Sequence, residues 1–143
     1  MKLIRYQDSA GKIHYGSLLQ DGSALRIEGS PFCKWEITQD AADVQKLLAP
    51  VEPRDIMCIG LNYRKHAAEG GQAIPEFPVL FMKNSGAAQN PGDPIVIPKK
   101  LLSTAVDYEC ELAIVIGKRC HNVSKGDALD YVLGYTCAND VSA

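Results

Sequence analysis

The chain has 143 residues, of which 46% are hydrophobic and 22% charged, a balance typical of a globular protein with a real core. A net charge of −2 without a long basic run argues against a nucleic-acid partner, and no apolar run is long enough to cross a membrane. The five cysteines show no C-x-x-C spacing, so we expect a reducing, cytoplasmic location rather than a disulfide framework or a zinc ribbon.

The first fifty residues predict a small subdomain built as a meander of antiparallel strands. Short alternating segments predict strands at 2–6, 13–19 and 24–27. Segment 40–50 predicts a short helix, because Asp40 can cap it and Pro50 lies just beyond its end. The composition changes near 49–53, which predicts a boundary between an N-terminal subdomain, 1–50, and a main domain that begins at 51–143.

The main domain predicts further strands with short helices, so the expected fold class is mainly β (α+β). Apolar segments predict strands at 56–60, 78–83, 94–98, 106–118 and 134–140, the first of them buried throughout. Asn62 is a suitable N-cap for a helix of about two turns, and Gly70 and Gly71 can end it. A second helix is predicted at 124–132, where Ser124 and Asp127 have capping-box spacing.

Two carboxylates in the segment DYECEL are candidate metal ligands. Glu109 and Glu111 share one face of a strand, because successive side chains point to opposite faces. Two carboxylates beside an apolar strand repel each other and resist burial, and a divalent cation removes both problems. Oxygen ligands select Mg²⁺, Mn²⁺ or Ca²⁺ over zinc. Asp140, among small and apolar neighbours, is the candidate third ligand. The alternatives are a solvated sheet face and an aspartate that opens a turn.

The segment LNYRKHAAEGG holds a candidate acid–base pair. His66 and Glu69 are three residues apart and therefore share one face of a helix, where the glutamate can orient the imidazole for general-base catalysis. The two glycines behind it can act as a hinge that lets the segment close over a substrate. The alternative is a solvated pair on a surface helix. Lys83, after an apolar strand, either faces the mouth of a site or begins a loop.

Four segments in one colinear order resemble the fumarylacetoacetate hydrolase family. They are GLNYRKHAAE, FMKN followed by NPGDPIVIP, DYECELAIVIGK, and CANDVSA. The resemblance runs from about Val51 to the end of the chain, and the N-terminal meander also resembles the small leading subdomain of many bacterial members.

The resemblance implies the family's mixed β-sandwich roll, normally assembled as a homodimer. It implies that Mg²⁺ or Mn²⁺, or Ca²⁺ in crystals, binds Glu109, Glu111 and Asp140. It places the catalytic dyad at His66 and Glu69, carried by a lid that orders on substrate binding. The residues expected to contact the substrate are Asn62, Tyr63 and Lys83.

The activity implied is that of a metal-dependent enzyme acting on 2-oxo acids or β-diketo acids, by C–C bond hydrolysis, decarboxylation or isomerisation. Family members continue past the aspartate by about as much again, so the chain is expected to be an N-terminal portion with an incomplete roll. The alternative is a truncated, inactive fragment that serves as an assembly or binding module. A plain β-rich domain with solvated carboxylates ranks last, because it treats four ordered segments as chance.

Overall fold

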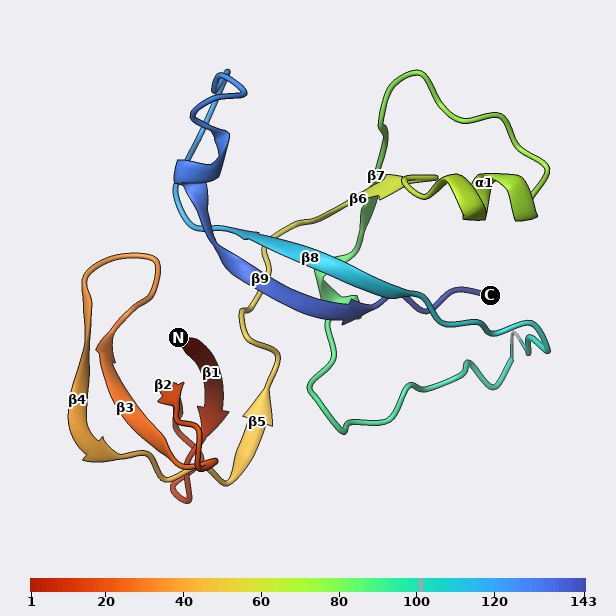
Figure 1. The fold of residues 1–143 in the computed structure, drawn as a ribbon. Helices are drawn as coiled ribbons and strands as arrows, with labels where there is room; N and C mark the ends of the chain where they lie inside the picture. Colours follow the sequence, from red (N-terminus) through yellow and green to blue (C-terminus); the bar gives the residue numbers. More distant parts are fainter. Residues whose placement is uncertain (101) are drawn as a thin grey trace.

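The first fifty residues form a five-stranded antiparallel sheet in a computed structural model that describes residues 1–100 and 102–143. The strands lie in the order β4-β3-β2-β1-β5 (Figure 1, red to yellow). Their bounds are β1, Lys2–Gln7; β2, Ile13–Leu18; β3, Ala24–Gly29; β4, Trp35–Ala41; and β5, Lys46–Leu48. The three predicted strands are confirmed, whereas β4 and β5 were not predicted.

The buried core of the described chain is concentrated in this sheet. Ile4 and Tyr6, two residues apart on β1, are 8% and 2% exposed and pack with Ala24. Gly16 of β2 pairs with Ile4, and a Cβ there would lie 3.2 Å from the ring of Tyr6. A glycine at this position therefore leaves room for the close approach of the tyrosine ring to the neighbouring strand.

The helix predicted at 40–50 is wrong. β4 extends to Ala41, and β5 adds to the free edge of β1 by pairing with Arg5–Gln7. Backbone pairing along an open strand edge outweighs the helical spacing of a few apolar residues, because helix propensity is weak in so short a segment.

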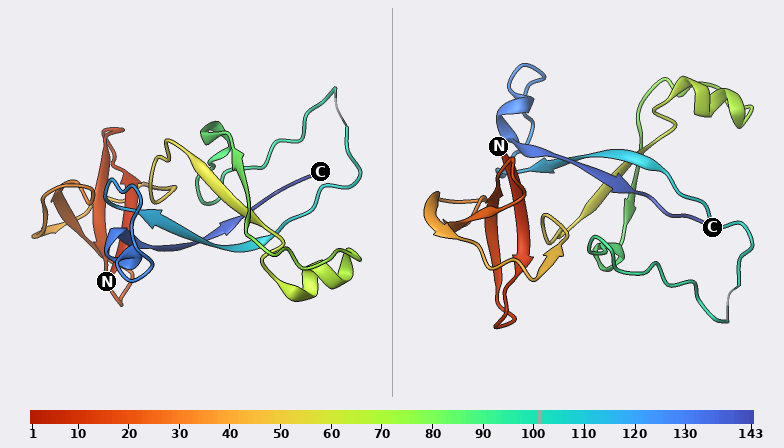
Figure 2. Two further views of the ribbon diagram at one scale, coloured as in Figure 1. Left: turned by 90° about the horizontal axis from the view of Figure 1, so that it is seen from above. Right: turned by 60° about the horizontal axis from the view of Figure 1, so that its bottom comes forward.

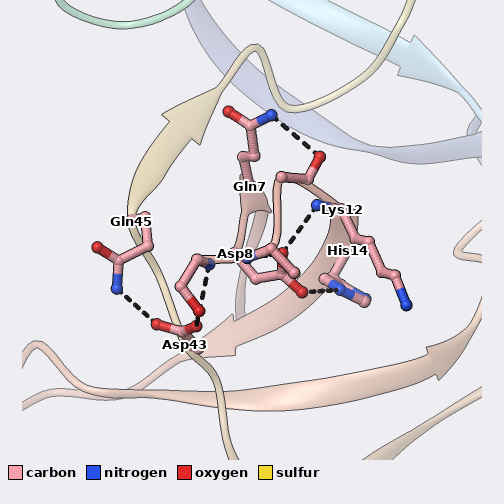
Figure 3. Close-up of polar contacts among 9 residues, drawn as sticks. Gln7, Asp8, Lys12, His14, Asp43 and Gln45 are labelled. Atoms are coloured by element: carbon pink, nitrogen blue, oxygen red, sulfur yellow. Dashed lines mark hydrogen bonds and ion pairs between the residues drawn. The ribbon is translucent and has the colours of Figure 1, made fainter.

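Side-chain hydrogen bonds hold the connection between β4 and β5 against the β1–β2 turn (Figure 3). The Asp43 carboxylate accepts hydrogen bonds from the hydroxyl and the backbone N–H of Ser9, at 2.6 and 3.0 Å. In the same turn Asp8 accepts from the backbone N–H of Lys12 and lies 2.8 Å from the ring nitrogen of His14. These carboxylates therefore order two connections that the apolar core does not reach.

The rest of the chain forms two antiparallel ribbons, β6 with β7 and β8 with β9. Their bounds are β6, Ile56–Gly60; β7, Val79–Lys83; β8, Cys110–Ile116; and β9, Val132–Asn139. The helix α1, Arg64–Glu69, follows β6, and short 3₁₀ helices lie at η1, Ser85–Ala87, and η2, Ala128–Tyr131. Figure 2 shows the β8–β9 ribbon crossing the β6–β7 ribbon, with α1 toward the end of the molecule where the chain terminates.

Several predicted elements of this part are corrected by the structure. Segment 94–98 is not a strand, and the strand predicted at 106–118 begins only at Cys110. At 124–132 the Ser124 hydroxyl accepts a hydrogen bond from the Asp127 backbone N–H at 3.3 Å, as in a capping box, but the turn that follows is 3₁₀ rather than α-helical. The mainly β fold class with short helices is confirmed.

Both ribbons expose much of their apolar surface. The strand β6 was predicted to be buried throughout, but its exposure alternates, and Met57 is 64% exposed. On β8 the outward face carries Leu112 and Ile114, which are 64% and 55% exposed. The two ribbons, as described, therefore have no compact core like that of the N-terminal sheet.

Polar contacts join the N-terminal sheet to the main domain. The Lys46 ammonium lies 2.7 Å from a carboxylate oxygen of Asp93, and the backbone N–H of Ala49 donates to the Asn90 side chain at 3.0 Å. The boundary predicted near residue 50 stays a prediction. No helix in the described ranges is long and apolar enough to cross a membrane.

Candidate metal centre

The pairing of β8 with β9 brings the predicted metal ligands together. Cys110 pairs with Asn139, and the backbone N–H of Asp140 donates to the carbonyl of Glu109 at 2.9 Å just beyond the strand end. Alternation along β8 then places Glu111 on the same side as Glu109. The antiparallel register therefore brings Glu111 of β8 close to Glu109, just before β8, and Asp140, just after β9.

The three carboxylates converge. One oxygen from each of Glu109, Glu111 and Asp140 lies within 4.8 Å of the other two. Glu109 is exposed, whereas Glu111 and Asp140 are half-buried. The carboxylate face of β8 is thus more buried than its apolar face, the reverse of a solvated sheet face. Like charges held this close and partly desolvated are stabilised by a cation.

Lys83 approaches this cluster from the other ribbon. It is the last residue of β7, and its ammonium forms an ion pair with a carboxylate oxygen of Asp140. The Lys83 side chain is 27% exposed and that of Asp140 is 12% exposed. The ion pair therefore ties the β6–β7 ribbon to the end of β9 at the candidate site.

The predicted acid–base pair lies on α1. His66 and Glu69 are both exposed, and the helix is anchored by the buried Ala67. Within the described residues no hydrogen bond joins the two side chains to each other or to the three carboxylates. The catalytic dyad stays a prediction, and the helix that carries it is present.

The turn before α1 differs from the prediction. Tyr63, not Asn62, is the N-cap residue, and its side chain makes no capping hydrogen bond. Leu61 has a φ of +50°, a conformation that costs a non-glycine residue free energy and is often found near functional sites. Asn62 and Tyr63 are exposed, so both side chains are free to meet a ligand, and their substrate contacts stay predictions.

A hollow of about 200 Å³ lies at the end of the β8–β9 ribbon, and the three carboxylates are not among the residues that line it. Asn139 and Val141, which flank Asp140 in the chain, contribute to it. Tyr108, two residues before β8, also lines the hollow, as do Ile95 and Ile97 of segment 94–98. The sequence shows that segment 94–98 is apolar, but the strand predicted there is wrong. The segment instead supplies apolar lining to this hollow.

The comparisons with known proteins agree with the geometry. The sequence model described as fumarylacetoacetate (FAA) hydrolase C-terminal matches residues 55–143. The chain belongs to the fumarylacetoacetate hydrolase family. Residues 1–50 match a second model, described as Rv2993c-like, N-terminal. The resemblance found in the four sequence segments is therefore confirmed.

Similar proteins include enzymes with different reactions in their names. Caffeoylpyruvate hydrolase of Neonothopanus nambi is 41% identical over 131 residues, 87% of this chain and 43% of that protein. Oxaloacetate tautomerase fahd2, mitochondrial, of Xenopus laevis is 48% identical over 98 residues, 68% of this chain and 30% of that protein. The crystal structure of 5-carboxymethyl-2-hydroxymuconate delta-isomerase from Mycobacterium smegmatis superposes with a TM-score of 0.84 at 35% identity, covering 100% of this chain and 56% of that one.

This chain spans about half or less of the length of these curated relatives. Similarity alone therefore does not transfer their complete activities to it. The donor set can nevertheless be tested directly against the expected metal. Three carboxylates that converge from two adjoining strands supply hard oxygen ligands only, and they fit Mg²⁺ or Mn²⁺ and not a thiolate-bound or imidazole-bound metal.

Proposed function

We propose that the protein is a divalent-metal-dependent enzyme acting on 2-oxo acids or β-diketo acids. The observation that carries this proposal is the convergence of Glu109, Glu111 and Asp140 within 4.8 Å in a chain of the fumarylacetoacetate hydrolase family. The named substrates of the two curated relatives, caffeoylpyruvate and oxaloacetate, are both 2-oxo acids, which supports the substrate class.

Each proposed site residue has a distinct task. Glu109, Glu111 and Asp140 hold Mg²⁺ or Mn²⁺, which when bound supplies Lewis-acid polarisation of a chelated 2-oxo-carboxylate. His66 accepts a proton from water, or moves one between substrate atoms, through an imidazole nitrogen. Glu69 orients that imidazole.

We propose that the acid–base segment moves to combine these tasks. Asn62 and Tyr63 lie at the entrance to α1, and Gly70 and Gly71 lie at its exit, where Gly71 has a φ of +61°. Closure of α1 about these ends brings His66 and Glu69 toward the substrate and excludes water. Lys83 stays near the carboxylates and contacts the end of the substrate that lies beside them.

Hydrolysis of a C–C bond, decarboxylation and isomerisation all act on a 2-oxo acid, whose carbonyl a metal held by the three carboxylates would polarise. They differ in what the substrate presents beyond the chelating group, and the relatives include a hydrolase, a tautomerase and an isomerase. We further propose a cytoplasmic enzyme that works as a homodimer. Five free cysteines support a reducing location, and the uncovered apolar ribbon faces support assembly.

The same uncovered faces favour a second candidate function. A chain that leaves Leu112 and Ile114 largely exposed also suits an assembly or binding module without catalysis. Metal binding separates the two functions, because only the first requires the three carboxylates to act as ligands.

Titration calorimetry with Mn²⁺ tests the proposed function. The 143-residue chain should bind one Mn²⁺ at a saturable site. Glu111→Gln should lower the affinity at least about tenfold, since the loss of even an outer-shell partner costs about 10- to 100-fold. Glu28→Gln, in β3 of the N-terminal sheet, removes the same charge far from the cluster in sequence and should leave the affinity unchanged. Equal affinity in Glu111→Gln and wild type would exclude the proposed ligand set.

A further inference from the structure

Lys83 is the only cation in direct contact with the candidate metal ligands in the described part of the chain. The ion pairs found there join Arg5 to Glu52, His14 to Asp8, Lys46 to Asp93 and Lys83 to Asp140. The first three lie in the N-terminal sheet or on its contacts with the main domain. The fourth touches the carboxylate cluster.

The ammonium of Lys83 lies beside the cluster and not at its centre. A cation placed between three oxygens that are within 4.8 Å of one another would contact all three. Lys83 pairs with Asp140 alone, and no ion pair within 4.0 Å joins it to Glu109 or Glu111 in the described residues. The space between the three carboxylates is therefore left for another cation, while Asp140 is also paired with Lys83.

The charges in this arrangement match a divalent ion. Three carboxylates carry three negative charges, and Lys83 offsets one of them. Lys83 and Asp140 are largely shielded from solvent, with side chains 27% and 12% exposed, so their interaction is screened less than a surface pair. The cluster as a whole thus presents two net negative charges.

We propose that Lys83 sets the charge selectivity of the metal site, favouring divalent over trivalent ions. The inference rests on the proposed function, because it requires the three carboxylates to bind a metal. Repulsion between the ammonium and a bound ion grows in proportion to the ion's charge, so Lys83 penalises a trivalent ion more than a divalent one. A purely structural role, holding Asp140 in place, would affect both ions alike.

The test compares Mn²⁺ and Tb³⁺, both of which prefer oxygen ligands. Affinities are measured by calorimetry for Mn²⁺ and by Tb³⁺ luminescence, for wild type, Lys83→Met, Lys83→Gln and Lys83→Arg. Lys83→Met and Lys83→Gln should raise the ratio of Tb³⁺ to Mn²⁺ affinity about tenfold, the effect of one unit charge several ångströms away in a partly buried site. Lys83→Arg keeps the charge and should keep the wild-type ratio.

The outcomes distinguish a failure of the charge-selectivity role of Lys83 from a failure of the proposed metal-dependent function. An unchanged ratio in Lys83→Met and Lys83→Gln, with Glu111→Gln still losing Mn²⁺, would overturn the charge-selectivity role and leave the metal site standing. No Mn²⁺ binding in wild type, or binding that is insensitive to Glu111→Gln, would overturn both. Circular dichroism would detect misfolding of Lys83→Met. Lys83→Gln retains a hydrogen-bond donor to Asp140, so the comparison can still be made if the methionine variant misfolds.

Discussion

Asp43 shows how one carboxylate makes local structure depend on pH. Its pKa is lowered to about 2 by the hydrogen bond from the Ser9 hydroxyl, then by that from the Gln45 amide, and then by that from the Ser9 backbone N–H. All three donors prefer the ionised carboxylate, which is therefore more acidic in the folded chain than in the unfolded chain. Figure 3 shows the carboxylate between the two segments it joins.

The first prediction follows from this lowered pKa. The stability that Asp43 contributes is fully present above its unfolded pKa of 3.8 and is lost as pH falls toward about 2. Unfolding in urea should therefore become easier across this range, and Asp43→Asn should reduce that dependence because an amide does not titrate. Asp55→Asn, in the exposed linker before β6, is the matched change of charge.

Unfolding in urea is followed by circular dichroism at a series of pH values for wild type and both variants. Asp8 and Asp93 also have lowered pKa values, Asp8 mainly through the Lys12 backbone N–H and Asp93 mainly through the Lys46 ammonium. The wild-type slope should therefore be reduced in Asp43→Asn rather than abolished. The same acid dependence in Asp43→Asn and wild type would show that these hydrogen bonds do not persist in solution.

At the scale of elements, alternation along strands was predictable and the choice of partner was not. β1, β2 and β3 follow from alternating side chains and polar turns. Segment 46–48 pairs with β1 because the edge of β1 is open, which depends on the assembled sheet. Segment 94–98 has the composition of a strand but finds no partner among the described residues, so it stays irregular.

The candidate site was also predictable only in part. The shared face of Glu109 and Glu111 follows from strand geometry, and their approach to Asp140 follows once β8 and β9 pair. The ion pair between Lys83 and Asp140 joins residues from separate ribbons, 57 positions apart. The spacing of residues in the sequence does not predict this ion pair, because the contact depends on how the two ribbons cross.

The second prediction concerns α1, where His66 and Glu69 are exposed and are not paired with the carboxylates in the described structure. His66→Ala should leave Mn²⁺ affinity unchanged, because the imidazole is not among the converging oxygen ligands. Turnover of a 2-oxo acid such as oxaloacetate should fall by about 10²- to 10⁴-fold, the usual contribution of general acid–base catalysis. Lys65→Ala, on the neighbouring position of the same helix, is the control and should retain activity. Normal turnover in His66→Ala would remove the dyad from the mechanism.

The molecule as a whole is unevenly packed. The buried cluster of Ile4, Tyr6 and Ala24 lies in the N-terminal sheet, while both ribbons of the main domain have apolar faces open to solvent. On the β8–β9 ribbon these are Leu112, Ile114, Ile116 and Tyr135, all between 48% and 64% exposed. A contiguous apolar face of this kind is typical of a surface that another part of an assembly covers.

The third prediction is that the 143-residue chain associates with itself through this face. Complete burial of a leucine or isoleucine side chain stabilises by about 1.5–3 kcal/mol, so the loss of two such contacts should weaken association by at least about tenfold. Leu112→Thr combined with Ile114→Thr places β-branched residues, which suit a strand, at both positions and removes the apolar contact. Sedimentation velocity over a range of concentrations should show wild type growing in mass and the double variant staying smaller.

A matched control separates this face from general surface hydrophobicity. Ile13→Thr with Ile37→Thr makes the same kind of substitution at residues of the N-terminal sheet that are 53% and 39% exposed. This variant should associate like wild type, because the two residues lie on β2 and β4 and outside the ribbon face. If both double variants lost association equally, the contact would not be specific to β8–β9. A monomeric wild type at every concentration would instead mean that the ribbon face is not an interface between copies of this chain.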